Sequence, residues 1–128
     1  MLQGSHAFSG FSVKDLDEAE EFYRHILELD VKNTGMGLEL HLSKELVVFV
    51  YEKEDHQPAT FTILNFGVDD VTETVQQLTE KGIEFLRYPD LPAPQDEYGV
   101  LRGKAAGYGP DIAWFADPSG NILSVLSN

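Results

Sequence analysis

The chain has 128 residues, of which 42% are hydrophobic and 24% charged, a composition typical of one globular domain with its own core. It has no cysteine, which excludes disulfides and cysteine-bound metal, and its net charge of −13 disfavours nucleic acid as a partner because phosphates are repelled. The opening MLQGSHAFSG lacks the regions of a secretory signal, and residues 46–51 form the longest apolar run, so we expect a soluble cytoplasmic protein that does not bind a membrane.

A repeated pattern divides the chain into two similar halves. The stretch FSVKDL at 11–16 returns as FGVDDV at 66–71, 55 positions further on. In each copy a strand is expected to end and a helix to begin, with Asp15 or Asp70 as the N-cap and a glutamate three positions later. The halves, about 7–53 and 60–127 of a single 1–128 domain, are joined by a polar linker.

In the first half, the sequence predicts a strand at 7–13 and then a helix that begins after Asp15. The helix carries apolar residues at helical spacing, and further strands are expected at 29–33, 38–42 and 45–51. The apolar stripe consists of Leu16, Ala19, Phe22, Tyr23, Ile26 and Leu27.

The second half repeats this order. A strand is expected at 60–68, and a helix that begins after Asp70 is expected to stop at Gly82. Three strands follow, at 83–88, 111–116 and 121–126, so each half has the order β-α-β-β-β. The last two strands are connected by Asp117-Pro118-Ser119-Gly120, which has the residues of a tight turn.

Residues 88–110 form a long segment rich in proline and glycine. Loops of this length in small domains often have a function, so the segment is either a loop that covers a ligand or a plain excursion of the chain. Arg102 and Lys104 are notable in it because the chain is otherwise acidic, and they are possible loop contacts for a ligand.

Together these features resemble the vicinal oxygen chelate superfamily, which includes glyoxalase I, extradiol dioxygenases, fosfomycin resistance enzymes and bleomycin resistance proteins. The resemblance implies an α+β, glyoxalase-like fold in which two β-α-β-β-β modules form a curved mixed sheet around a cleft. It also implies a homodimer. The residues that carry it are Asp15-Leu16, Ala19, Phe22-Tyr23, Leu27 and Asp117-Pro118-Ser119-Gly120-Asn121.

Enzymes of this superfamily usually hold one divalent metal through His, Glu or Gln on the first and last strands of each module. The resemblance places these ligands at Phe8 and Ile63 on the first strands. On the last strands it places them at Ser124 and at Val48, or at Val50 if the register differs by two. Three of the four positions lack a donor atom, and one serine hydroxyl is a poor ligand, so we expect no metal and no other cofactor.

Other side chains offer donor atoms near these positions. His6 shares the face of Phe8 by strand alternation, although Gly4-Ser5-His6 is also the pattern of a cloning remnant. His41 and Glu39 form a polar patch in the cleft if their side of the strand faces it, and they face solvent if Leu38 and its neighbours form the core instead. His25 and His56 are expected on the surface, and no nucleophile–base pair is visible.

An apolar cleft with a few polar groups suits a small organic ligand. Trp114 either closes this pocket or packs against a helix. By strand alternation and the resemblance, the expected lining is Phe8, His41, Val48, Val50, Ile63, Asn65, Trp114 and Ser124.

Three functions are consistent with this sequence. The favoured one is a metal-independent protein that binds a small molecule, as in the bleomycin resistance branch. The first alternative is a lyase, isomerase or dioxygenase that recruits a metal through His6, His41 or Glu39. The second is a protein-interaction or regulatory module whose cleft is filled with side chains.

Overall fold

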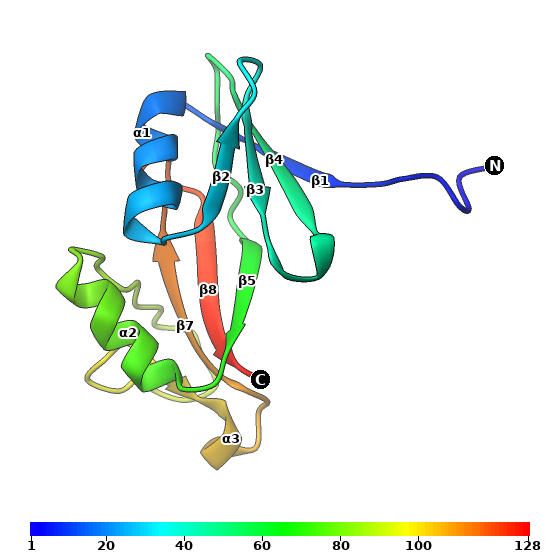
Figure 1. Cartoon of the computed structure of the whole chain (residues 1–128). Coiled ribbons are helices and arrows are strands. Elements are labelled where there is room, and N and C mark those ends of the chain that lie inside the picture. The colour runs from blue at the N-terminus through cyan, green and yellow to red at the C-terminus, as the bar shows by residue number, and fades with distance from the viewer. The chain divides into compact units, whose positions relative to one another are not determined.

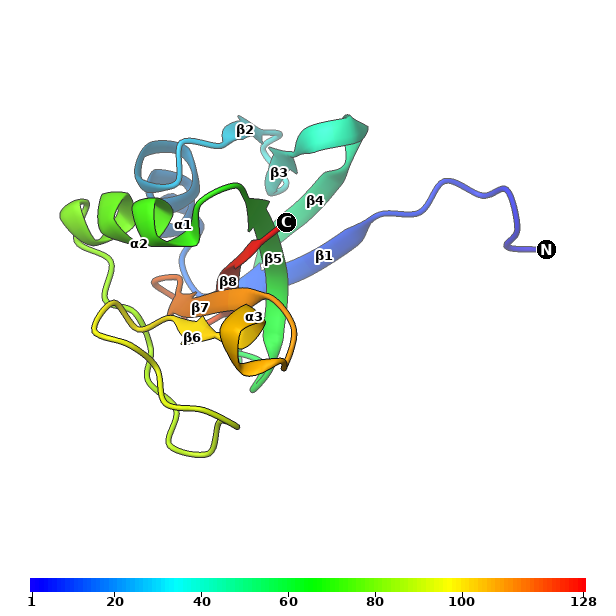
Figure 2. The same cartoon turned by 90° about the horizontal axis from the view of Figure 1, so that it is seen from below.

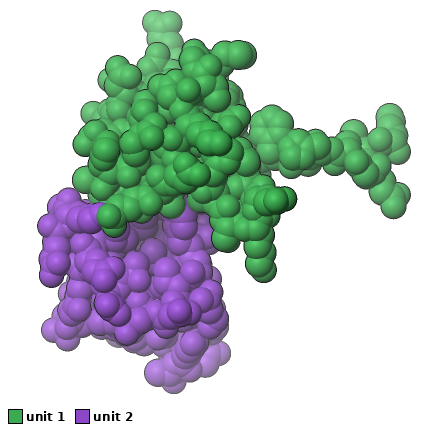
Figure 3. All heavy atoms as spheres, viewed as in Figure 1, with its two compact units in different colours: residues 1–58 green, residues 59–128 purple.

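The computed structural model describes residues 1–128 and divides into two compact units, 1–58 and 59–128 (Figure 3). Each unit contains one four-stranded mixed sheet, with a helix directly after its first strand. The two units therefore correspond to the two sequence repeats, and the predicted α+β class is confirmed. None of the helices has both the length and the apolar run needed to cross a bilayer.

Unit 1 contains four strands, one α-helix and two short helical turns (Figure 1). Its sheet has the order β1-β4-β3-β2, in which β1 runs parallel to β4 and the other pairs are antiparallel. The elements are β1 (Ser9–Val13), α1 (Leu16–Glu21), a π-helix η1 (Phe22–Ile26), β2 (Asp30–Asn33), β3 (Leu38–His41), a 3-10 helix η2 (Ser43–Glu45) and β4 (Val47–Glu52).

Unit 2 has the same plan with a longer insertion before its last two strands (Figure 2). Its sheet has the order β5-β8-β7-β6, and β5 runs parallel to β8. The elements are β5 (Thr62–Val68), α2 (Val71–Glu80), β6 (Leu101–Arg102), α3 (Gly103–Ala106), β7 (Asp111–Ala116) and β8 (Ile122–Ser127).

Both predicted helix caps are present. The Asp15 carboxylate accepts a hydrogen bond from the backbone N–H of Glu18 at 3.0 Å, and Asp70 accepts one from the N–H of Glu73 at the same distance. These contacts satisfy N–H groups that have no partner inside the helix. Helix α2 ends at Glu80 with Lys81 as its C-cap, and Gly82 follows with a φ of 98°, a conformation that favours glycine.

Each sheet has one face covered by the helix of its unit, here called the helix face. In unit 1, Phe11 pairs with Val50, and the ring of Phe11 lies 5.9 Å from that of Tyr23 in η1. In unit 2, α2 packs on β7 and β8, where Phe115 and Leu123 are fully buried. We call the opposite side of each sheet its open face.

The strand predicted at 83–88 is absent, whereas every other predicted strand begins and ends within two residues of the observed one. Leu86 makes a single backbone bond to the carbonyl of Trp114, at 2.8 Å. The side chain of Gln95 bonds the Leu86 carbonyl and the Tyr88 N–H, at 2.9 and 2.7 Å. A side chain thus takes the place of a neighbouring strand, and the edge of the sheet is formed by β6 instead.

Candidate ligand site

The open face of the unit 1 sheet carries a pocket with a volume of about 450 Å³. This volume lies within the range of sites for small organic ligands. The pocket is lined by His6, Phe8, Thr34, Met36, Glu39, Val47 and Phe49.

Apolar side chains form most of this surface. Phe8 and Met36 are 62% and 85% exposed, and exposed apolar side chains that gather around one pocket are typical of a binding site. The rings of Phe49 and Tyr51 are stacked at an interplanar angle of 18° with their centroids 6.1 Å apart. A flat ligand would therefore meet aromatic and thioether surface here.

One polar pair lies on the same face. Glu39 pairs with Phe49 across β3 and β4, and His41 pairs with Val47, so both polar residues are on the open side of the sheet. The Nε2 atom of His41 lies 3.0 Å from Oε1 of Glu39. Leu38 and Leu40 are core residues, as in the second of the two sequence-based alternatives, so Glu39 and His41 lie on the opposite, partly exposed side of β3. There Glu39 also lines the pocket, whereas His41 does not.

Val48 and Val50 do not line this pocket, contrary to the sequence-based prediction. They pair with Leu40 and Leu38 on the helix face, and all four side chains are buried. Cross-strand neighbours share a face of the sheet, so two core leucines on β3 require core residues opposite them on β4. The predicted register was therefore wrong by one residue, and β4 presents Val47 and Phe49 to the open side.

In unit 2, Asn65, Trp114 and Ser124 occupy paired positions on the open face. The Ser124 hydroxyl is fully buried and donates to Oδ1 of Asn65 at 2.5 Å. Trp114 packs its ring edge-to-face against Tyr88 at 5.4 Å, and burial raises the pKa of the Tyr88 hydroxyl.

The resemblance also placed Phe8 and Ile63 at ligand positions on the first strands. Ile63 lies at the irregularity between Thr62 and Leu64, where β5 shifts register with β8. Phe8 precedes β1 and reaches the pocket of unit 1.

The positions that the resemblance assigns to metal ligands do not fit a divalent ion. Phe8 and Ile63 have no donor atoms, and Val47 and Phe49, which replace Val48 and Val50 on the open face, have none either. The one donor, the Ser124 hydroxyl, is already bonded to an amide oxygen. Neither unit brings together three or more His, Asp or Glu side chains in a metal-binding group. The residues at these positions therefore do not supply a ligand set for a divalent ion.

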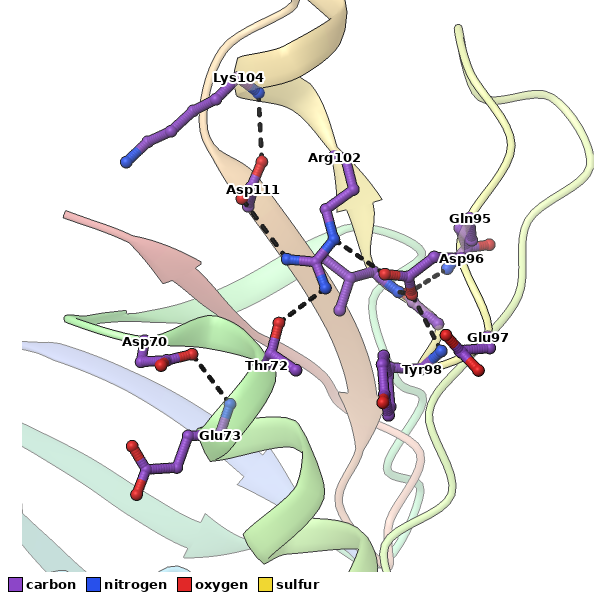
Figure 4. Close-up of polar contacts among 12 residues, drawn as sticks. Asp70, Thr72, Glu73, Gln95, Asp96, Glu97, Tyr98, Arg102, Lys104 and Asp111 are labelled. Carbon is purple, nitrogen blue, oxygen red and sulfur yellow. Dashed lines mark hydrogen bonds and ion pairs between the residues drawn. The ribbon is translucent and has the colours of Figure 1, made fainter.

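Arg102 is held by its own unit (Figure 4). Its guanidinium donates to Asp96 at 2.8 Å and to the Thr72 hydroxyl on α2 at 2.7 Å, and lies 3.6 Å from the Asp111 carboxylate. Lys104 contributes its backbone N–H to Asp111, while its ammonium group points away from this cluster (Figure 4). Of the two predicted loop contacts, Lys104 is the one with an exposed charge.

Two residues that the sequence did not single out organise this loop. Asp96 accepts bonds from the N–H groups of Tyr98 and Val100, both at 2.9 Å, and from Arg102. Burial alone would raise the pKa of Asp96, but these donors outweigh it and hold the pKa below its usual value. Gln95 bonds the backbone of Leu86, Tyr88 and Gly99. These hydrogen bonds tie the segment to its own unit before and after residues 89–94.

Comparison with known proteins identifies the class. Residues 5–125 match the family model described as the Glyoxalase/Bleomycin resistance protein/Dioxygenase superfamily, so the chain belongs to that superfamily. No curated protein matches the chain significantly.

Solved structures share the fold at low identity. An integron cassette protein from the mobile metagenome of a Halifax Harbour sewage outfall has a TM-score of 0.70 and 18% identity, and the match covers 97% of this chain and 99% of that one. The fosfomycin resistance protein FosX from Listeria monocytogenes has a TM-score of 0.68 and 16% identity, covering 98% and 93%. TnmS3, an antibiotic binding protein from Streptomyces sp. CB03234, has a TM-score of 0.63 and 19% identity, covering 97% of each chain.

Proposed function

We propose that this protein binds a small organic molecule, without a metal, on the open face of its unit 1 sheet. The observation that carries the proposal is the pocket of about 450 Å³, whose largely apolar lining includes one carboxylate, that of Glu39, which pairs with His41 outside the lining. An apolar pocket with few polar groups is the usual form of a small-molecule site. The lack of metal donors at the superfamily's ligand positions supports binding over metal-assisted chemistry.

The pocket favours a flat ligand that carries a positive charge. Phe8, Met36 and Phe49 offer aromatic and thioether surface, and Glu39 supplies a negative charge beside it. Aromatic faces attract cations, and a net charge of −13 raises the local concentration of cationic molecules. TnmS3, which shares the fold, is described as an antibiotic binding protein, so binding of a small organic molecule has a parallel in this fold.

A homodimer in the cytoplasm is part of this proposal, because the superfamily resemblance implies that assembly. Leu46 and Tyr51, which are 52% and 38% exposed, add apolar surface in unit 1 that a second chain would cover. Light scattering coupled to size-exclusion chromatography measures the mass directly. A monomer at micromolar concentration would remove the dimer from the proposal and leave the pocket unaffected.

The binding experiment compares a cationic and an anionic aromatic probe. Proflavine, a planar cation, is titrated into the protein and followed by its fluorescence, in parallel with the anion 8-anilinonaphthalene-1-sulfonate. We expect proflavine to bind more tightly, and Glu39→Gln and Phe8→Ala each to weaken it about fivefold, equivalent to about 1 kcal/mol. The matched controls are Glu45→Gln and Phe61→Ala, which remove an exposed carboxylate of unit 1 and a ring as exposed as that of Phe8, both outside the pocket lining.

Two results would overturn the proposal. If the pocket variants bind proflavine as tightly as the wild type, the ligand site lies elsewhere. If the protein retains about one Mn, Fe, Co, Ni or Zn per chain after incubation and desalting, metal-independent binding is wrong. The metal-dependent enzyme then becomes the better reading, with His6, His41 and Glu39 as the first residues to substitute.

A further inference from the structure

A serine and a histidine that are 44 positions apart form a close pair in unit 1. The Ser12 hydroxyl oxygen lies 2.6 Å from Nδ1 of His56, and the contact is partly buried. No sequence pattern indicates this pair, because His56 lies in the polar linker, where an isolated surface residue is expected. A serine within hydrogen-bond reach of an imidazole is the basic arrangement of an activated nucleophile.

Backbone contacts hold the two side chains in place. Ser12 is on β1, paired with Tyr51, and is therefore on the open side of the sheet. The linker is fastened to the end of β1, since the N–H of Lys53 donates to the Val13 carbonyl at 3.0 Å. The N–H of His56 in turn donates to the Lys53 carbonyl at 3.0 Å, which closes a turn. The backbone that carries His56 is thus anchored next to Ser12 at the end of β1.

We propose that Ser12 is an acyl-accepting nucleophile with His56 as its general base, and that its substrates are small carboxylic esters with a good leaving group. With the ring proton on Nε2, Nδ1 accepts the proton of the Ser12 hydroxyl. The Oγ–carbonyl carbon bond forms, the bond from that carbon to the leaving oxygen breaks, and the proton passes from Nδ1 to the leaving oxygen. This step yields acyl-Ser12 and the free alcohol or phenol.

Water completes the cycle. A water molecule gives a proton to Nδ1 and bonds to the acyl carbon, the carbon–Oγ bond breaks, and the proton returns to Oγ. The products are the carboxylic acid and the original serine, so no oxidant, reductant or metal is needed. This activity uses neither Glu39 nor Phe8 and is independent of the proposed binding function.

The test uses p-nitrophenyl acetate with the full-length chain. p-Nitrophenol release is followed by absorbance, and the acetylated residue is located by peptide mass spectrometry after acid quenching. We expect acetyl-Ser12 in the wild type and about a 100-fold slower acetylation of this residue in His56→Asn, because a positioned general base contributes at least this much.

Matched variants separate nucleophilic catalysis from nonspecific acetylation. Ser9→Ala removes another hydroxyl from β1, and His25→Asn removes an exposed imidazole from the same unit, so both should react like the wild type. The proposal is wrong if Ser12→Ala releases p-nitrophenol at the wild-type rate, or if acetyl groups map only to lysines. Mapping of diisopropyl fluorophosphate on the wild type repeats the test without any substitution, and no label on Ser12 would also overturn the proposal.

Discussion

The polar cluster around Arg102 gives the most quantitative prediction. In Arg102→Met the apolar stem of the side chain remains but its guanidinium is lost. Asp96, Thr72 and Asp111 then lose the donor that connects the loop to α2 and β7 (Figure 4). Two carboxylates are also left without their nearest cation. We therefore expect a loss of global stability and not only a local loosening of the loop.

The size of the effect follows from the exposure of each contact. Arg102 and Asp96 are 35% and 27% exposed, so their charged hydrogen bond contributes about 1–1.5 kcal/mol, between the values for surface and buried pairs. The bond to Thr72 adds about 1 kcal/mol, and Asp111 at 3.6 Å adds a few tenths. The sum is about 2–3 kcal/mol, which lowers the Tm of a protein of this size by roughly 6–12 °C.

The control is Arg24→Met. Arg24 is 36% exposed and forms an ion pair of 2.7 Å with Glu20, so its exposure and contact length match those of Arg102, but its partner is one helix turn away. Such pairs contribute only about 0.3–0.5 kcal/mol. Urea unfolding and calorimetry of both variants give the comparison. If Arg102→Met lowers the unfolding free energy by no more than Arg24→Met does, the argument that Arg102 connects several partners is wrong.

Further substitutions test other parts of the structure. Asp96→Asn should destabilise the protein at pH 7 but progressively less below about pH 4. The folded state lowers the pKa of Asp96, so its contribution to stability is present above the unfolded pKa and disappears as the pH falls through the folded pKa. An equal loss of unfolding free energy at pH 3 and pH 7, measured with urea, would contradict this. Asn65→Ala should lower the stability by more than the roughly 1 kcal/mol expected for Ser124→Ala. Although Asn65 is exposed, its removal leaves the buried Ser124 hydroxyl without its partner. Calorimetry that shows the opposite order would refute the assigned hydrogen bond. Val48→Ala should lower the unfolding free energy by about 2 kcal/mol, because Val48 is buried on the helix face, and Val47→Ala by less than about 1 kcal/mol. Equal losses in urea unfolding would contradict the observed register of β4.

The fold could be predicted largely from local signals in the sequence. Asp15 and Asp70 cap their helices as expected, because an N-cap needs only a short polar side chain and the next three residues. The chain order of the strands in the first half also followed from hydrophobic alternation and the repeat. In the second half the strand expected at 83–88 is absent, and the short β6 was not predicted. The five residues of the π-helix η1 had no such signal and were expected to continue the α-helix.

The site was harder to predict because it depends on pairing between strands. Alternation along β4 shows that Val48 and Val50 share a face, but only the register with Leu40 and Leu38 shows which face it is. The contact between Ser12 and His56 depends in the same way on where the linker meets β1. Neither fact is present in any short stretch of sequence, since each is set by residues brought together only in the folded unit.

The order β5-β8-β7-β6 has a consequence for how unit 2 folds during synthesis. The strand that joins β5 to β7 is β8, and it is the last of the four to leave the ribosome. Thr62 must find Ile122 across 60 intervening steps of the chain, and pairings of this range are slow to form. Before residues 122–127 have been made, β5 has no strand beside it in its own sheet. The new chain therefore holds an unpaired apolar strand throughout the synthesis of unit 2, which is when we expect it to be most prone to aggregate.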